Sequence, residues 1–376
     1  MKFYSILLTM SLILCVSCKN VNTEPTTLKD AIALVRPDVE IGVFRCIKNF
    51  ATAEQAAIVE NFEKTECNVL TVGTYMFNSK AIDDTTYFAF FDKQVNFAKE
   101  NNLNIHLHPL IGADQYMPKW LTKGDYSEKE LEKIMRDWIT SILTRYPEIS
   151  SVDVVNEALS GLDENGDFVW NNEPNVWMKL GWYEGKKHRF PRYLIEAYKI
   201  ATEVAPENVK LIYNENKNST IDSPHGLATL KLYHALREEG IKVDAIGLQM
   251  HMAMRNINGV FGETWEQDYD YDSLRALIKL FEEQNVDFYV SEFDIEMPKD
   301  PTPEEYEEQG RYYGEILDIL LDSPSFKSYK TWGVADSFSW IRPWRGYNGQ
   351  PLLLDENFEK KPSYYKMLEV IINHNK

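Results

Sequence analysis

Two short stretches place carboxylates directly after runs of apolar, β-branched residues. In "DVVNEAL", Asn156 and Glu157 follow a valine-rich run. In "SEFDIE", Glu292 and Asp294 lie two residues apart and would share one side of a strand. Two carboxylates on facing strands can divide acid and base work between them when their surroundings differ. The pattern therefore predicts a catalytic cleft, provided that the fold brings the two stretches together.

Eight short apolar runs alternate with longer helical patterns along the chain. The runs cover 40–44, 68–73, 104–111, 151–155, 209–214, 245–250, 287–293 and 331–338. Helices are predicted near 88–101, 127–146, 190–204, 226–239, 272–284 and 303–322, and after Pro362. This alternation predicts an α/β fold, a single (β/α)8 TIM barrel over residues 39–376, with 159–189 as a long loop. Catalytic groups of such barrels lie at the carboxyl ends of the strands.

A pair of carboxylates across a cleft suits the hydrolysis of a glycosidic bond. One protonates the leaving oxygen, and the other meets the positive charge that develops at the anomeric carbon. His251 can donate a hydrogen bond to Glu292, and Asp294 can orient that histidine, which favours an ionised Glu292. Glu157 has no charged neighbour within three residues and follows an apolar strand, which favours a raised pKa. We therefore expect Glu157 to act as acid/base, Glu292 to act as nucleophile, and Asn156 to bond the sugar 2-hydroxyl.

Six stretches lie in order between about residues 40 and 370: "DVVNEAL", "LIYNE", "IGLQMHM", "SEFDIE", "WGVADSFSW" and "PLLLDENFEKKPSYY". Together they resemble the family 10 glycoside hydrolases, the family of endo-1,4-β-xylanases. The resemblance implies retaining hydrolysis of β-linked xylose polymers, with no metal and no cofactor. Beside the two glutamates it implies supporting roles for Asn156, Gln249, His251 and Asp294. It also implies a sugar cleft lined by His108, Asn214, Trp332 and Trp340, and Trp344 is a further candidate for this cleft.

Two stretches depart from the pattern of that family. After the second strand the family carries an acidic residue, an Asn and a nearby Lys, whereas this chain has Gly73, Thr74 and Phe77. After the third strand, Gly112 and Ala113 stand in place of Trp and His. The catalytic residues are kept while the sugar-holding residues differ. The pattern thus leaves open which glycan and decoration are bound, and whether cleavage is internal or terminal.

Two other classes of protein remain as alternatives. "HLH" places His106 and His108 on one side of a strand, where they could share a metal ion in a metal-dependent barrel hydrolase. Such a site needs further His or Asp ligands on other strand ends. A second alternative is a surface glycan-binding lipoprotein on an inactive barrel, although binding alone does not require paired glutamates.

The charge of the chain limits its partners. The formal net charge is −18 over 376 residues, which opposes binding to nucleic acid or to an anionic membrane surface. A neutral polysaccharide is the expected substrate, and we expect a monomer. Of the four cysteines, Cys46 and Cys67 are predicted to be free thiols.

The first residues, "MKFYSILLTMSLILCVSC", combine a lysine with an apolar run that is too short to span a bilayer. We interpret residues 1–17 as a signal peptide, Cys18 as a lipidated first mature residue, and 18–38 as a polar tether. The membrane would be contacted only through this lipid. The protein would then be extracytoplasmic, anchored to a bacterial (outer) membrane on its periplasmic or outer face. A cleaved signal with a soluble product is the alternative.

Overall fold

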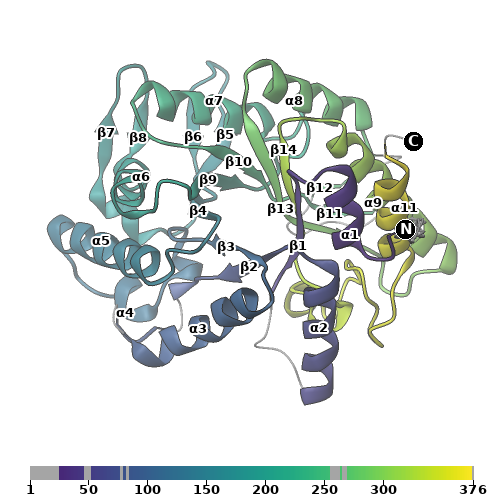
Figure 1. Ribbon diagram of the computed structural model, residues 1–376. Helices are drawn as coiled ribbons and strands as arrows, with labels where there is room; N and C mark the ends of the chain where they lie inside the picture. The colour runs from purple at the N-terminus through teal and green to yellow at the C-terminus, as the bar shows by residue number, and fades with distance from the viewer. Residues whose placement is uncertain are drawn as a thin grey trace, which may run out of the picture.

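Within the described residues, eight parallel strands close into one barrel (Figure 1). The computed structural model describes residues 25–45, 52–76, 79–81, 84–254, 263–264 and 269–374. The barrel strands are β1 (Glu40–Phe44), β2 (Val69–Gly73), β3 (Asn104–His108), β4 (Ser151–Asn156), β9 (Lys210–Glu215), β10 (Ala245–Leu248), β13 (Asp287–Glu296) and β14 (Phe326–Thr331). Strand β1 pairs with β14, and β10 pairs with β13 to complete the ring. The predicted (β/α)8 TIM barrel is confirmed.

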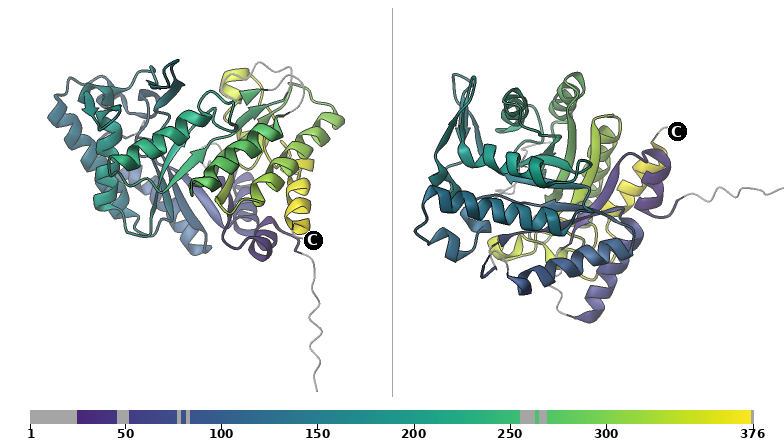
Figure 2. Two further views of the ribbon diagram at one scale, coloured as in Figure 1. Left: turned by 90° about the horizontal axis from the view of Figure 1, so that it is seen from above. Right: turned by 60° about the vertical axis from the view of Figure 1, so that its left-hand side comes forward.

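Helices lie outside the strands in every view (Figures 1 and 2). They are α1 (Leu28–Val35), α2 (Ala53–Glu66), α3 (Thr85–Glu100), α4 (Lys119–Thr122), α5 (Glu128–Arg145), α6 (Arg192–Val204), α7 (Gly226–Glu238), α8 (Tyr271–Glu283), α9 (Pro303–Leu321), α10 (Arg342–Arg345) and α11 (Pro362–Asn373). Helix α5 begins after Ser127 with a capping box to Glu130, because the serine hydroxyl accepts from the glutamate backbone and the glutamate bonds back. No helix among the described residues is long and apolar enough to cross a bilayer.

The prediction for the eighth strand was wrong. We expected it at 331–338, but β14 ends at Thr331. Its sequence, "FKSYKT", lacks an apolar run because polar residues alternate with the aromatic ones. Two of these polar residues, Ser328 and Lys330, are nevertheless fully buried, and the lysine amine donates to the serine hydroxyl at 3.1 Å. The "WGVADSF" segment instead lies past the tip of the strand. Trp332 is therefore the first residue beyond β14.

The predicted tether over 18–38 extends too far. Residues Leu28–Val35 form α1, an amphipathic helix that buries Leu28, Ala31 and Ile32. It packs on α11, the last helix of the chain, and both lie beside the N and C labels of Figure 1. The polar composition of residues 18–38 gave no clear sign of this helix, which packs as part of the folded domain. Cys18 and the predicted signal peptide lie outside the described residues, as does Cys46, whereas Cys67 is a buried free thiol.

The long segment predicted as a loop at 159–189 contains two hairpins. They are formed by β5 (Leu159–Leu162) with β6 (Phe168–Trp170), and by β7 (Trp182–Glu184) with β8 (Arg189–Pro191). The remaining short elements are β11 (His251–Ala253), β12 (Glu263–Thr264), η3 (Asp114–Tyr116), η4 (Val176–Leu180) and η5 (Asp336–Phe338). The hairpins lie outside the strand ring, beside α6 and α7 (Figure 1). They form an extension built directly on the end of β4.

Candidate active site

A cavity of about 250 Å³ lies at the carboxyl ends of the barrel strands. Of the residues predicted from sequence, it is lined by His108, Glu157, Gln249, His251, Glu292, Trp332 and Trp340. Sequence reasoning missed Tyr75, Gln115, Tyr116, Glu173 and Asn216, which also line it. The barrel thus brings the two predicted glutamates, from β4 and β13, to one cavity.

Glu157 is held at a sharp turn directly after β4. Its φ of +56° lies in the left-handed region, which is uncommon for a residue other than glycine and marks local strain. The strained peptide is fixed on both sides. The Glu157 backbone N–H donates to the Asn214 carbonyl at 3.0 Å, and the Asn171 side chain donates to the Glu157 carbonyl at 3.0 Å. This turn directs the carboxyl group into the cavity.

The surroundings of Glu157 favour its protonated form. Burial is the main cause, because it penalises the charged carboxylate. The hydrogen bond that Gln249 Nε2 donates to Glu157 Oε1 at 2.7 Å lowers the pKa, but the nearby charges of Glu215 and Glu292 raise it again. The net result raises the pKa of Glu157 to about 7.

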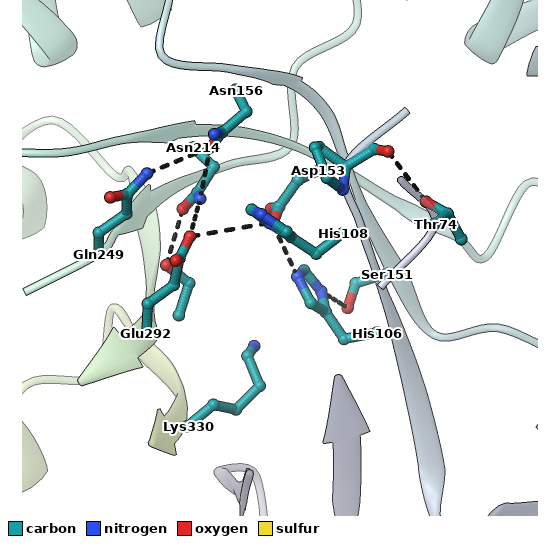
Figure 3. A network of polar contacts seen from close by, with 12 residues as sticks. Thr74, His106, His108, Ser151, Asp153, Asn156, Asn214, Gln249, Glu292 and Lys330 are labelled. Atoms are coloured by element: carbon teal, nitrogen blue, oxygen red, sulfur yellow. Dashed lines mark hydrogen bonds and ion pairs between the residues drawn. The ribbon is translucent and has the colours of Figure 1, made fainter. Parts of the chain in front are cut away.

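Glu292 has donors on both carboxylate oxygens. Its Oε1 accepts from Asn214 Nδ2 at 2.7 Å and lies 3.7 Å from His108 Nδ1. Its Oε2 lies 3.2 Å from His251 Nε2. Only 3% of the residue is exposed, so these contacts replace water around the carboxylate (Figure 3). Hydrogen bonds to the ionised form stabilise it, and this arrangement suits a carboxylate that must attack.

His251 links Glu292 to a second carboxylate. Its Nδ1 lies 2.8 Å from Asp294 Oδ1, and Trp340 Nε1 donates to Asp294 Oδ2 at 2.6 Å. Burial opposes a charge on His251, but the carboxylates of Asp294 and Glu292 outweigh burial and raise the pKa of His251 to about 10. The histidine is therefore cationic near neutral pH and donates from both ring nitrogens. Asp294 is thus placed to orient His251, and this supporting role stays a prediction.

Three side-chain amides, those of Asn156, Asn214 and Gln249, connect the two glutamates. Asn156 Oδ1 accepts from Asn214 Nδ2 at 2.9 Å and from Gln249 Nε2 at 3.2 Å (Figure 3). The Nδ2 group of Asn156 is therefore the part that can donate to a sugar hydroxyl. Asn214 was predicted to line the cleft, but it is fully buried and reaches the cavity only through Asn156 and Glu292. Asn214 is a positioning residue, because its amide holds the side chains of Asn156 and Glu292.

The two histidines of β3 share one carboxylate. Asp153 Oδ2 lies 2.9 Å from His106 Nε2 and 2.7 Å from His108 Nδ1, and His106 Nδ1 lies 2.8 Å from Ser151 Oγ (Figure 3). Both ring nitrogens of His106 are thus engaged beneath the cavity. Among the described residues, no group of three or more His, Cys, Asp or Glu is placed to hold a metal ion. The arrangement does not favour the metal-dependent alternative, since Ser151 and Asp153 engage both ring nitrogens of His106 and this histidine does not line the cavity.

Comparison with known proteins agrees with this geometry. The model of glycosyl hydrolase family 10 matches residues 36–370. The chain belongs to glycosyl hydrolase family 10. This result confirms the family that the six motifs predicted, and the protein is a glycoside hydrolase.

The proteins similar to this chain that follow are all described as xylanases. "Endo-1,4-beta-xylanase B" of Thermotoga neapolitana is 29% identical over 339 residues, which cover 89% of each chain. The "Beta-1,4-xylanase" of Dictyoglomus thermophilum is 28% identical, covering 82% of this chain and 84% of the relative. Among solved structures, xylanase 10B from Thermotoga petrophila in complex with xylobiose aligns with a TM-score of 0.76 at 26% identity, covering 93% of this chain and 98% of that one. Native xylanase 10B from Thermotoga maritima aligns with a TM-score of 0.75 at 28% identity, covering 92% and 98%.

Two tyrosines lie beside glycines of the two stretches that depart from the family 10 pattern. The rings of Tyr75 and Tyr116 stack with centroids 5.1 Å apart and an interplanar angle of 24°. A Cβ atom added at Gly112 would lie 2.9 Å from the Tyr116 ring, and one added at Gly73 would lie 3.1 Å from the Tyr75 ring. The glycines therefore leave the space that the rings occupy. We call the stacked pair Tyr75 and Tyr116 the tyrosine wall.

The tyrosine wall has a weak signal in the sequence. Each tyrosine follows a strand end by a few residues, and each is preceded by the glycine that makes room for it. A glycine and an aromatic residue close together after a strand end are common in loops. The spacing alone would not have distinguished these two tyrosines from ordinary core residues. Phe77, the third departure after β2, lies outside the described residues.

The predicted tryptophans lie beside the nucleophile. Trp332 stacks on Phe44 with centroids 4.2 Å apart and presents an edge-to-face contact to His108 at 5.0 Å. Trp340 lies 4.8 Å from the His251 ring. Both line the cavity, in agreement with a place for a sugar ring. The side chain of Trp344 lies outside the described part of the structure.

Proposed function

We propose that this protein hydrolyses β-1,4-linked xylan, or a related β-linked plant polysaccharide, with retention of configuration. The observation that carries the proposal is the pairing of Glu157 and Glu292 in one cavity, with surroundings that raise the pKa of the first and place hydrogen-bond partners on both oxygens of the second. The relatives named as xylanases, and the related structure that holds xylobiose, support the choice of sugar.

In the first step, one carboxylate oxygen of Glu292 bonds to the anomeric carbon while the glycosidic C–O bond breaks. The proton of Glu157 passes to the leaving oxygen, which departs as the hydroxyl of the shortened chain. A covalent glycosyl-enzyme ester remains at Glu292. Cationic His251, 3.2 Å from Glu292 Oε2, orients the carboxylate for this attack.

In the second step, Glu157 acts as the base. Ester formation removes the negative charge of Glu292, which had raised the pKa of Glu157. The pKa of Glu157 therefore falls in the intermediate, and the group that gave a proton is left as a carboxylate. It takes a proton from water as the water oxygen bonds to the anomeric carbon and the Glu292–sugar bond breaks.

The proposal is tested by product release from a panel of polymers. Linear xylan, arabinoxylan, glucuronoxylan and mixed-linkage β-glucan are incubated with the wild type and with Glu292→Ala, and the products are separated by chromatography. We expect oligosaccharides from at least one xylan with the wild type only. Products from the β-glucan alone would overturn the choice of xylan but keep the reaction. No product from any polymer, together with retention on xylan, would support a binding protein on an inactive barrel.

For the finer specificity, the tyrosine wall is proposed to select the sugar by shape. Its two aromatic faces are held by ring stacking, and it lines the same cavity as the two glutamates. Tyr116→Ala removes one ring and Tyr116→Phe keeps it. The ratio of kcat/KM between decorated and linear xylan should change by about tenfold in the first variant and stay unchanged in the second. An unchanged ratio in both variants would contradict a role in selection.

The lipid anchor remains a proposal that rests on the sequence. Cys18 follows an apolar run and a small residue, and only residues 19–27 separate it from α1. In a bacterial host, the full chain should sediment with membranes and become soluble in Cys18→Ala. A soluble wild type after signal removal would support the alternative of a secreted enzyme.

A further inference from the structure

A second hollow, of about 410 Å³, lies on the two hairpins that follow β4. It is lined by Asp167, Phe168, Trp170, Trp182, Lys187, His188 and Arg189, which we call the hairpin surface. These residues lie on or next to β6, β7 and β8, and none of them lines the catalytic cavity. We propose that the hairpin surface binds a segment of an uncharged β-linked glycan chain. The choice of ligand rests on the function proposed above.

Of the aromatic rings of the hairpin surface, Trp182 is exposed, whereas Phe168 and Trp170 are half-buried and pack against the core. Trp182 is 39% exposed, which is unusual for so large an apolar side chain, and the Arg189 guanidinium lies 4.6 Å from its ring centroid. The Phe168 ring lies 5.3 Å from Trp170 and 5.0 Å from His188. Phe190, fully buried, backs both Phe168 and Trp170 at about 6 Å. Rigid amphipathic rings of this kind suit the apolar C–H face of a pyranose, because little ordering is needed on binding.

The charges of the hairpin surface are balanced within the protein. Lys187 lies 2.9 Å from Glu238, and Arg189 lies 2.8 Å from Glu184. Asp167 adds a negative charge at the edge. A basic patch for an anionic sugar would leave such cations unpaired, whereas exposed ion pairs are weak and readily share hydrogen bonds with hydroxyl groups. The surface therefore favours a neutral glycan.

Strand β6 links the hairpin surface to the turn that holds Glu157. Strand β6 ends at Trp170, and the next residue, Asn171, donates to the Glu157 carbonyl at 3.0 Å. The Asn171 backbone N–H donates to the Ala158 carbonyl at 2.8 Å, and Glu173 lines the catalytic cavity. A polymer that leaves the cavity past Glu173 would meet this strand next. The surface would then hold the chain on the enzyme between cleavage events, since two linked contacts raise the effective concentration at each site.

Retention on insoluble, undecorated xylan tests this proposal without turnover. All variants carry Glu292→Ala, so that bound polymer is not cut. Trp182→Ala should reduce the association constant for the insoluble xylan by about fivefold or more, since loss of a stacked ring costs about 1 kcal/mol. Trp182→Thr is a second variant that keeps strand propensity, in case the first weakens the hairpin. Val169→Ala is the matched control, because Val169 is 40% exposed and points to the opposite face of β6.

Equal retention for Trp182→Thr and Val169→Ala, with unchanged thermal melting, would overturn the proposal. Retention of glucuronoxylan alone would overturn the neutral ligand. The cleavage panel separates this result from the proposed function. Trp182-dependent retention without cleavage of any xylan would contradict the substrate assignment and leave the surface site standing. Cleavage with Trp182-independent retention would contradict the surface site alone.

Discussion

The two sides of the catalytic cavity treat the same functional group in opposite ways. On the β13 side, Glu292 is 3% exposed and lies within 3.2 Å of an amide donor and a cationic histidine. On the β4 side, Glu157 meets the neutral amide of Gln249 and lies near the charge of Glu215. Because both residues are glutamates, their difference comes from their neighbours. Both carboxyl groups are enclosed by the protein, so the different hydrogen-bond donors and neighbouring charges are what suit one to act as acid and the other as nucleophile.

The largest expected effect removes the charged side of this comparison. Glu292→Ala takes away the attacking oxygen, and kcat should fall by about 10⁴-fold or more, as measured by oligosaccharide release. Thermal melting of the purified variant serves as the control for folding. A variant that keeps more than about one hundredth of wild-type kcat would assign the nucleophile to another residue.

Glu157→Gln removes the acid side and should lower kcat on xylan by about 10²- to 10⁴-fold. For an aryl glycoside, whose leaving group needs little protonation, the loss in kcat/KM should be small, whereas kcat should still fall because the second step has lost its base. In the wild type, kcat/KM on xylan should decline as pH rises through about 7, because Glu157 loses its proton there.

The pH profile gives the sharper readout of that substitution. The alkaline limb near pH 7 should disappear when Glu157→Gln is assayed with the aryl glycoside. A limb that persists unchanged would assign the titration to another group and would break the contrast between the two glutamates.

Asp294→Asn removes one of the two carboxylates that keep His251 charged beside Glu292. The carboxylate of Asp294 is the leading neighbour that raises the pKa of His251, so the pKa should fall from about 10 toward the ordinary range. We expect a reduction in kcat of about tenfold, with a new dependence on pH where the histidine loses its proton. NMR titration of His251 measures the shift directly. Asp318→Asn, at an aspartate 58% exposed on α9, is the matched control and should leave both readouts unchanged.

The smallest expected effect concerns the strained turn on the β4 side. Asn171→Ala removes the donor to the Glu157 carbonyl and should lower kcat by about two- to fivefold, with a loss of about 1 kcal/mol of stability. Asn172→Ala, at the exposed next position, is the control. If both variants behave alike, the turn is held by its strand contacts and not by this side chain.

The barrel was predictable because most strands carry a clear apolar signal. Strand β14 was misplaced, since a barrel interior accepts polar residues such as Ser328 and Lys330 once they are paired with each other. Helix α2 was missed for a similar reason: it buries Glu63, which pairs with Arg45, among few apolar residues. In both cases tertiary contacts supplied what the local pattern lacked.

The catalytic half of the cavity was more visible in the sequence than the sugar-holding half. Glu157 directly follows β4, Glu292 lies within β13, and their partners lie in or directly after other barrel strands, so their convergence follows from the barrel itself. The tyrosine wall depends on loop paths after β2 and β3, which no strand period dictates. Asn214 shows the reverse error, because its motif indicated a cleft residue while its depth in the barrel was invisible in sequence.

The packing of α1 against α11 has a consequence for the order of folding. The Leu28 backbone N–H and the Tyr364 hydroxyl both donate to Glu66 Oε2, at 2.9 and 3.0 Å, although Glu66 and Tyr364 are 298 positions apart in the chain. The docking surface of α1 is therefore complete only when α11 is in place, although α2 and β1 supply the rest of it. Contacts of such long range close slowly, because the loop between them loses entropy before any contact forms. Docking of α1 is thus completed late, and a fragment that begins at residue 39 would keep the bond from the Tyr364 hydroxyl to Glu66 but lose the one from the Leu28 N–H.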